Sequence, residues 1–300
     1  MERVEATWSS RALWLVTRPV RALDFLRRYP LLPAVVLVAL VITGIVARVV
    51  APYNPIIGNM WERATPPMWQ AGGSAKHILG TDHVGRDVLS RLLYGAQVSL
   101  MVAGISVSAG FVVGSTLGVI AGWFGGIIDE IITRFVDMWM ATPFLLVALI
   151  VALVLGQSLV ILLTLLAILA WVGFVRVVRG HALTFKDSDY ISLAKVAGAS
   201  TWRILRVHVV PGIINTAVIN ATLNIGTLIM MEATLSFLGV GIPPPTPSWG
   251  GMVSDGRNYL VDAWWQSFFP GLCIFLTVLS LQFLGDWLRD YLDPRLRQLI

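Results

Sequence analysis

The stretch DYISLAKVAGASTWRILRVHVVPG, Asp189 to Gly212, differs from the segments on both sides of it. Its neighbours are long apolar runs with almost no charge, whereas this stretch carries Lys195, Arg203 and Arg206. Its spacing of apolar residues is typical of helix, and a small-residue break lies in its middle. A helical, water-compatible insert between two apolar runs indicates a connection that lies outside the lipid of a membrane.

The composition supports a membrane protein. Of 300 residues, 56% are hydrophobic and 13% are charged, and the mean hydropathy is +0.77. A soluble domain carries roughly 25% charged residues. The single cysteine, Cys273, excludes an intrachain disulfide and a cysteine-based metal site.

The apolar runs predict six membrane-spanning helices, because about 20 apolar residues cross a bilayer as a helix. We expect spans near Leu31–Val50, Ser99–Gly122, Ile132–Leu155, Leu159–Val175, Ile213–Leu238 and Gly271–Leu288. The predicted fold class is therefore an all-α membrane protein with six transmembrane helices.

Basic residues set the expected orientation. Sixteen of the 22 Lys and Arg residues lie on one side of the predicted spans: six before the first, Arg134 after the second, six after the fourth and three after the last. Excess Lys and Arg mark the cytoplasmic side. We expect both termini and the opening stretch in the cytoplasm. The basic residues flank apolar runs, so a nucleic-acid partner is not expected, although the pI is near 9.7.

This topology divides the chain into four parts. Residues 1–52 form an N-terminal cytoplasmic segment with the first span, and 53–97 form an extracytoplasmic loop. Residues 98–288 form a five-helix core that contains the insert at 181–212, and 289–300 form a cytoplasmic tail.

The apolar spacing of the insert predicts a short helix followed by a second helical segment. Tyr190, Leu193, Ala194 and Ala197 form an apolar stripe from Asp189 onward, with Ser188 as the expected cap. Gly198, Ala199 and Ser200 end this helix, and a second stripe runs to Pro211. Two interpretations stay open: a hairpin lying on the membrane surface, or a knob that enters a groove on a cytoplasmic partner.

The predicted spans contain a glycine repeat and a glutamate, each of which can be interpreted as structural or as functional. Gly110, Gly114, Gly118 and Gly122 recur every fourth residue, a pattern that favours close helix packing, with lining of a pathway as the alternative. Glu232 is an ionisable residue at membrane depth, and such residues are functional candidates by default. A protonated or hydrogen-bonded packing residue is the other reading.

The expected outer loop contains two short polar motifs, Gly80-Thr81-Asp82 and Gly85-Arg86-Asp87. Their context favours turn and cap chemistry over a metal site. A run of three prolines, Pro243 to Pro245, leads to Trp249 and predicts a stiff, extended external segment. It is either a rigid connector or a contact for an external protein.

The chain lacks a phosphate-binding loop, because none of its three lysines follows the glycine that G-x-x-x-x-G-K-[ST] requires. We expect no catalytic residues and no cofactor bound by this chain. The competing class is an ion-coupled secondary transporter that uses Glu232. A channel or a purely structural membrane protein ranks third.

The insert resembles the EAA loop of ABC importer permeases. Gly198 falls on the motif glycine and Pro211 on its proline, while Ser192 and Leu193 replace Glu-Ala, His208 replaces Ile and Val210 replaces Leu. Three more stretches resemble the C-type permeases of dipeptide and oligopeptide transporters: HILGTDHVGRDVLSRLLYGAQVSL (His77–Leu100), EATLSFLGVGIPPPTPSWGGM (Glu232–Met252) and LGDWLRDYLDPRL (Leu284–Leu296). The resemblance covers nearly the whole chain.

This resemblance implies a type I ABC importer permease in a bacterial inner membrane, importing dipeptides or oligopeptides. Such a subunit forms half of the translocation pathway, pairs with a B-type permease, and docks onto one or two kinds of ATPase subunit that bind ATP and magnesium. An extracytoplasmic binding protein delivers the substrate. The resemblance assigns ATPase coupling to Asp189, Tyr190, Leu193, Ala194, Ala197, Gly198, Ala199, Ser200 and Pro211. It assigns the face toward the binding protein to Gly80, Thr81, Asp82, Gly85, Arg86, Asp87 and Trp249.

Overall fold

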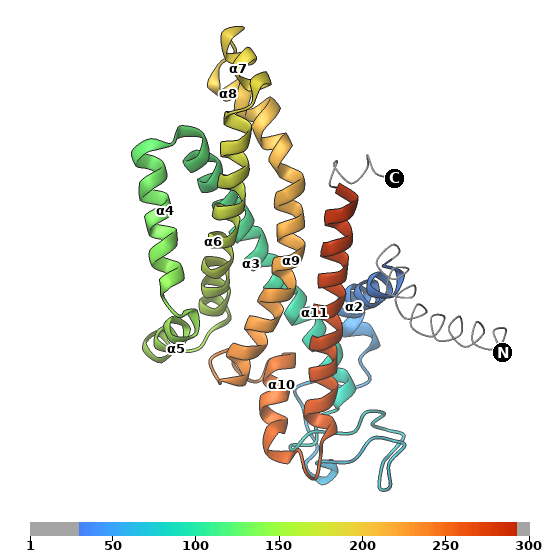
Figure 1. The fold of residues 1–300 in the computed structure, drawn as a ribbon. Helices are drawn as coiled ribbons and strands as arrows, with labels where there is room; N and C mark the ends of the chain where they lie inside the picture. The colour runs from blue at the N-terminus through green and yellow to red at the C-terminus, as the bar shows by residue number, and fades with distance from the viewer. Residues whose placement is uncertain (1–29, 293–300) are drawn as a thin grey trace, which may run out of the picture.

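The described chain, residues 30–292 of a computed structural model, consists of helices joined by loops (Figure 1). The long helices are α2 (Leu31–Val50), α3 (Val88–Phe124), α4 (Gly126–Ala141), α5 (Phe144–Leu155), α6 (Leu159–Lys186), α9 (Val210–Phe237) and α11 (Trp265–Leu292). The short helices are α7 (Asp189–Val196), α8 (Thr201–Ile204) and α10 (Trp249–Gly256), with a π turn η2 (Leu205–Val209) and 3-10 turns η1 (Met60–Glu62) and η3 (Arg257–Tyr259). The predicted all-α class is confirmed.

Within residues 30–292, five helical stretches are long and apolar enough to cross a membrane: α2, α3, α6, the run Thr201–Phe237 and α11. The first predicted span coincides with α2. The helices α3, α6 and α11 extend past the predicted apolar limits, because a helix can continue through polar residues beyond the apolar stretch that crosses the lipid. Thus α6 passes Arg176 and Arg179 and ends only at Lys186.

The predicted third span, Ile132–Leu155, is wrong as a single helix. The chain forms α4 and α5 there, bent by 81° relative to each other. Pro143 lies at the break; it has no N–H to donate and its ring clashes with the preceding turn. The residue before it, Thr142, is extended, as residues before proline prefer. If this bent pair counts as one span, the total reaches the predicted six.

The helices α3 and α6 share the most extensive helix contact in the described chain. The predicted glycine repeat lies in this contact, with Gly110, Gly114, Gly118 and Gly122 all against α6. A Cβ added to Gly114 would lie 2.3 Å from the carbonyl oxygen of Trp171, and one on Gly110 would lie 2.5 Å from the Cβ of Ala170. The two backbones therefore approach as closely as small residues allow.

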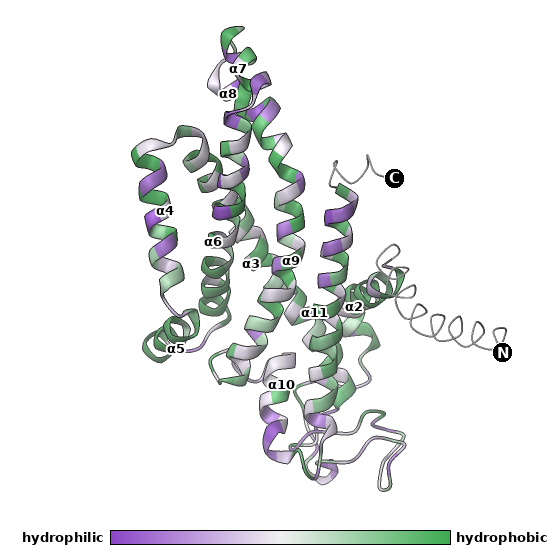
Figure 2. Cartoon of the chain, in the orientation of Figure 1, coloured by the Kyte–Doolittle hydropathy of each residue, from purple (hydrophilic) through white to green (hydrophobic). Residues whose placement is uncertain are grey.

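The bundle has two distinct ends (Figure 1). At one end, called the α7 end here, α6 and α9 project beyond the other helices and carry α7 and α8. At the opposite end, the α10 end, lie the loop 51–87 and α10. Hydrophilic residues concentrate at both ends and on α4, while the middle of the bundle is mainly hydrophobic (Figure 2).

Parts of two predicted segments lie outside the described residues. These parts are residues 1–29, which carry the six arginines before the first span, and residues 293–300 of the predicted tail, with Arg295 and Arg297.

Candidate functional site

The helix α7 ends in a hydrogen-bonded glycine cap. Gly198 has a left-handed φ of 82°, its N–H donates to the carbonyl of Lys195 at 3.0 Å, and the Ala199 N–H donates to the carbonyl of Ala194 at 3.0 Å. This pair of bonds is the Schellman pattern, in which glycine adopts the left-handed conformation without a Cβ penalty. The cap reverses the chain tightly between α7 and α8.

The α7–α8 hairpin is anchored by a residue outside the predicted stripe. Ile191 is fully buried and packs in one cluster with Val178, Ile204 and Val209. Of the predicted stripe, Ala194 is half-buried, whereas Tyr190, Leu193 and Ala197 are exposed. More exposed apolar side chains, Val196 and Trp202, extend this outward face. We call Tyr190, Leu193, Val196, Ala197 and Trp202 the hairpin face.

The caps of the hairpin differ in one detail from the prediction. Ser188 occupies the N-cap position of α7, but its hydroxyl donates to the carbonyl of Phe185 at 2.5 Å and caps no N–H of α7. Ser200 does cap α8, accepting from the N–H of Arg203 at 3.3 Å. Pro211 follows the π turn η2, whose wider spacing accommodates a residue without an N–H donor.

Two ion pairs join α6 to the broken span. Arg176 donates to Asp137 at 2.8 Å, and Arg179 donates to the two carboxylate oxygens of Asp129 at 2.5 and 2.7 Å. The sequence prediction placed both arginines in a loop beyond the fourth span; they lie instead on the last turns of α6 and hold α4 against it. This contact is polar because Asp129 and Asp137 lie on one face of α4, eight residues apart.

The loop 51–87 is organised by Asp87. Its carboxylate caps α3, accepting from the N–H and the hydroxyl of Ser90 at 2.7 Å each, and it also pairs with His77 Nδ1 at 2.9 Å. All three side chains are buried. A carboxylate at a helix N-terminus is stabilised by the free N–H groups there.

Asp82 is the second organising carboxylate. It accepts from the N–H groups of Val84 and Arg86 at 3.0 and 2.9 Å, and pairs with the side chains of Arg86, at 2.6 Å, and Arg91. Burial by itself raises the pKa of Asp82, but the charge of Arg91 and the bonds from Arg86 outweigh it and hold this pKa below its ordinary value. Arg91 also reaches Asp255 of α10, at 3.3 Å.

Several residues predicted to face an external protein point inward. Thr81, Asp82 and Asp87 are buried in the loop network, and Gly80 and Gly85 are buried beside them. Trp249 is also buried, and its indole N–H donates to the carbonyl of Leu92 at 3.0 Å. Arg86 is half-buried and faces a pocket. The assignment of these residues to the face toward a binding protein stays a prediction; the buried ones hold the loop in shape from within.

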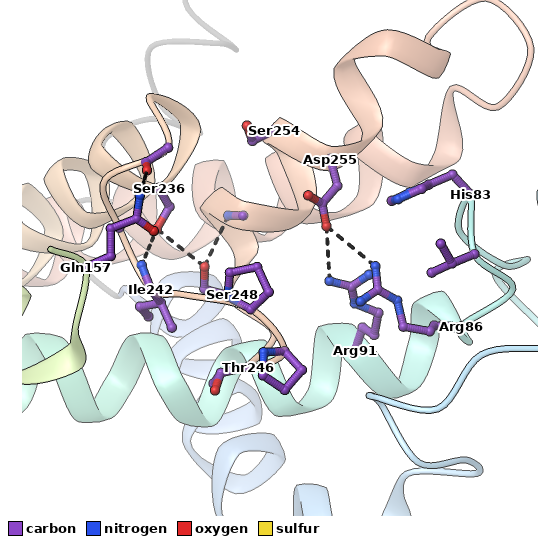
Figure 3. Close-up of a pocket in the computed structure, with 16 residues that line it drawn as sticks. His83, Arg86, Arg91, Gln157, Ser236, Ile242, Thr246, Ser248, Ser254 and Asp255 are labelled. Carbon is purple, nitrogen blue, oxygen red and sulfur yellow. Dashed lines mark hydrogen bonds and ion pairs between the residues drawn. The ribbon is translucent and has the colours of Figure 1, made fainter. Parts of the chain in front are cut away.

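Glu232 lies near the end of α9 with only 1% of its surface exposed. One carboxylate oxygen accepts from the hydroxyl of Ser236 at 2.7 Å, and the other has no hydrogen-bond partner among the described residues. Ser236 and Ser248 line a pocket that opens beside Glu232 at the α10 end (Figure 3). A buried carboxylate with an unsatisfied oxygen is costly without a compensating ligand or proton.

Sequence reasoning missed the long-range partners of this region. Trp265 is buried and donates its indole N–H to the carbonyl of Thr81 at 3.0 Å, 184 residues away in sequence. Asp255 and Arg91 are 164 residues apart. A motif in a single sequence does not indicate which distant residues will pair with it. The burial of Ile191, by contrast, could have been suspected from its apolar side chain.

Comparison with known proteins supplies the family. The family described as "Binding-protein-dependent transport system inner membrane component" matches residues 114–298. The chain is 39% identical to the di/tripeptide transport system permease protein DppC of Pseudomonas aeruginosa, over 86% of this chain and 85% of that protein. It is 43% identical to the dipeptide transport system permease protein DppC of Escherichia coli, over 88% of each chain.

A solved structure is similar in fold. A chain from inward-facing MetNI, a methionine ABC transporter, superposes with a TM-score of 0.56 at 20% sequence identity, covering 68% of this chain and 97% of that one. The shared helical bundle and the family match agree with the predicted permease fold. The chain therefore belongs to the inner-membrane components of binding-protein-dependent ABC transport systems, as a non-catalytic permease subunit similar to the DppC-type permeases.

Proposed function

We propose that this chain is one of two permease subunits in an ATP-driven importer of dipeptides and short oligopeptides. The names of its DppC relatives support the substrate class. A B-type permease would complete the translocation pathway, an external binding protein would deliver the peptide, and ATP and magnesium would be bound by separate ATPase subunits.

The observation that carries this proposal is the hairpin face. This face lies at the end of α6 and α9, which extend beyond the other helices (Figure 1), and its apolar side chains are largely exposed: Leu193 is 68% exposed and Trp202 is 71% exposed. An apolar helix face of this kind fits a groove on another protein. We assign the groove to an ATPase subunit.

The proposal also implies which end of the bundle faces the cytoplasm. The α7 end carries Lys195, Arg203 and Arg206, and excess basic residues favour the cytoplasm. The α10 end then faces outward, toward the binding protein. The ion-coupled alternative based on Glu232 is not carried forward, because the family depends on a binding protein and on ATP.

The decisive experiment is co-purification of the ATPase subunits with Leu193→Asp. A buried charge in the proposed groove should release the ATPase subunits, while the membrane spans stay inserted because the Leu193 side chain is largely exposed and lies outside them. Leu260→Asp is the matched control, since Leu260 is similarly exposed but lies at the α10 end. Full retention of the ATPase subunits by Leu193→Asp would overturn the docking assignment.

A further inference from the structure

A cavity of about 510 Å³ opens at the α10 end, between the start of α3, the end of α9 and the segment that leads into α10 (Figure 3). Pockets of about 300–1,000 Å³ hold small ligands. Two groups of polar residues lie at opposite sides of this cavity: Ser236 and Ser248 on one side, and Arg86 and Arg91 on the other (Figure 3).

The first group is a hydroxyl pole with a negative charge behind it. Ser236 and Ser248 line the cavity, and their hydroxyls lie 3.5 Å apart. Ser236 bonds to one carboxylate oxygen of Glu232, whose other oxygen is unpaired in the described chain. Only the Ser236 hydroxyl therefore separates the carboxylate of Glu232 from the cavity. A cation bound in the cavity at this point would compensate the negative charge of that carboxylate.

Glycines keep this pole open. A Cβ on Gly241 would lie 1.9 Å from the Ser236 hydroxyl oxygen, and one on Gly251 would lie 3.1 Å from that of Ser248. Any larger residue at position 241 would displace the hydroxyl that links Glu232 to the cavity.

The second group is a guanidinium pole. Arg86 and Arg91 line the cavity and share the carboxylate of Asp255, at 3.7 and 3.3 Å. These distances exceed the roughly 2.7–2.9 Å of a strong charge-assisted hydrogen bond. By contrast, Asp82 holds Arg86 at 2.6 Å. Asp255 is 43% exposed, so it is the loosely held partner of this pole.

A carboxylate from a ligand can replace Asp255 at this pole, because the two groups have the same charge and geometry. Arg86 and Arg91 would keep their pairing with Asp82 during the exchange. The cavity thus offers one place for an ammonium group and one for a carboxylate, and its lining also includes Pro244 and Pro245, which carry no charge.

We propose that this cavity binds a short zwitterionic peptide, with its ammonium group toward Ser236, Ser248 and Glu232 and its carboxylate toward Arg86 and Arg91. This inference rests on the proposed function and names a receiving site for its substrate on the permease itself. The site recognises only the two peptide ends, so side chains of differing size are tolerated.

The test measures protection of a cysteine in the cavity. Thr246 lines the cavity and is exposed, so Thr246→Cys in a Cys273→Ser background reports access through its rate of labelling by an impermeant maleimide. The transporter complex is reconstituted in nanodiscs without binding protein. Dialanine at millimolar concentration should slow labelling several-fold, whereas N-acetyl-dialanine amide, which lacks both charges, should not. Asn258→Cys, exposed and outside the cavity, is the control site.

Two substitutions probe the poles separately. Glu232→Gln should abolish protection by dialanine. Asp255→Asn should lower the dialanine concentration needed for protection, because it removes the competing carboxylate; a purely structural Asp255 predicts no such gain. Equal labelling rates with and without dialanine, or weaker protection in Asp255→Asn, would overturn the site.

Uptake separates this inference from the proposed function. Dialanine uptake by the complete transporter with its binding protein, but without protection of Thr246→Cys, overturns only the receiving site. Absence of peptide uptake by the complete transporter overturns the proposed function.

Discussion

The ammonium group of Lys195 lies over the indole ring of Trp123, 5.3 Å from its centroid. Lys195 belongs to α7 and Trp123 to the last turn of α3. Trp123 also packs in the same cluster as Ile191, the residue that anchors α7. The hairpin therefore contacts α3, and the glycine repeat of α3 packs closely against α6. A displacement of α7 should consequently move both helices.

Replacing Lys195 with Met should weaken coupling without loss of assembly. The cation–π contact contributes about 0.5–1 kcal/mol, and Met keeps the aliphatic length of the side chain. We expect less peptide imported per ATP hydrolysed in the reconstituted complex. Lys76→Met, an exposed lysine at the α10 end, is the control. An unchanged ratio of uptake to hydrolysis would mean that the contact transmits nothing.

Gly114→Ala should lower the thermal stability of the solubilised complex. The added methyl group would lie 2.3 Å from the Trp171 carbonyl oxygen, a backbone atom that cannot move without shifting α6. Overpacking of this kind costs about 1–3 kcal/mol. Gly104→Ala on the same helix is the matched control, because its Cβ meets no described atom within 4 Å. Equal melting temperatures for the two variants would contradict the tight α3–α6 contact.

The lowered pKa of Asp82 predicts that the folded protein becomes less stable in acid. Its pKa is lower in the folded protein than its ordinary value of 3.8, so the stability it contributes is complete above that value and is lost as pH falls through the lowered pKa. Asp82→Asn should be less stable than wild type at pH 7. The difference in melting temperature should shrink below about pH 4. A difference that stays constant from pH 7 to pH 3 would exclude this role of the carboxylate.

Composition and local pattern predicted the elements of the fold well. The apolar run Leu31–Val50 became α2 with the same limits, and the small helix from Asp189 was found because Gly198 stops it. These features depend on nearby residues. The break at Pro143 was also local, and it was missed because an apolar run was read as one helix across a proline.

The direction of side chains was less predictable. In a helix as short as α7, an apolar stripe does not reveal which face is anchored, so Tyr190 and Leu193 were not distinguished from the buried Ile191. The inward positions of Trp249 and Trp265 depend on carbonyl groups more than 150 residues away. Only the three-dimensional structure brings these groups together.

Cysteine labelling tests the orientation of the bundle. In a Cys273→Ser background, Lys76→Cys should react with an impermeant maleimide added outside intact cells, because its loop faces outward in the proposed topology. Asp189→Cys, at a position that is also exposed, should react only after the cells are opened. The reverse pattern would invert the topology and would place the hairpin outside.

Ala197→Trp should uncouple the transporter. Ala197 is exposed on the hairpin face, so a bulky side chain there disturbs no internal contact of this chain, whereas Ala194 is half-buried against the Ile191 cluster and is a poorer test. In an ATPase groove, the extra volume should cost about 1–3 kcal/mol of docking energy and reduce both ATP hydrolysis and uptake. Ala75→Trp, an exposed alanine in the loop 51–87, controls for the substitution itself. If the hairpin only lay on the membrane surface, a tryptophan would be favourable at that interface, and Ala197→Trp would leave both rates at wild-type values.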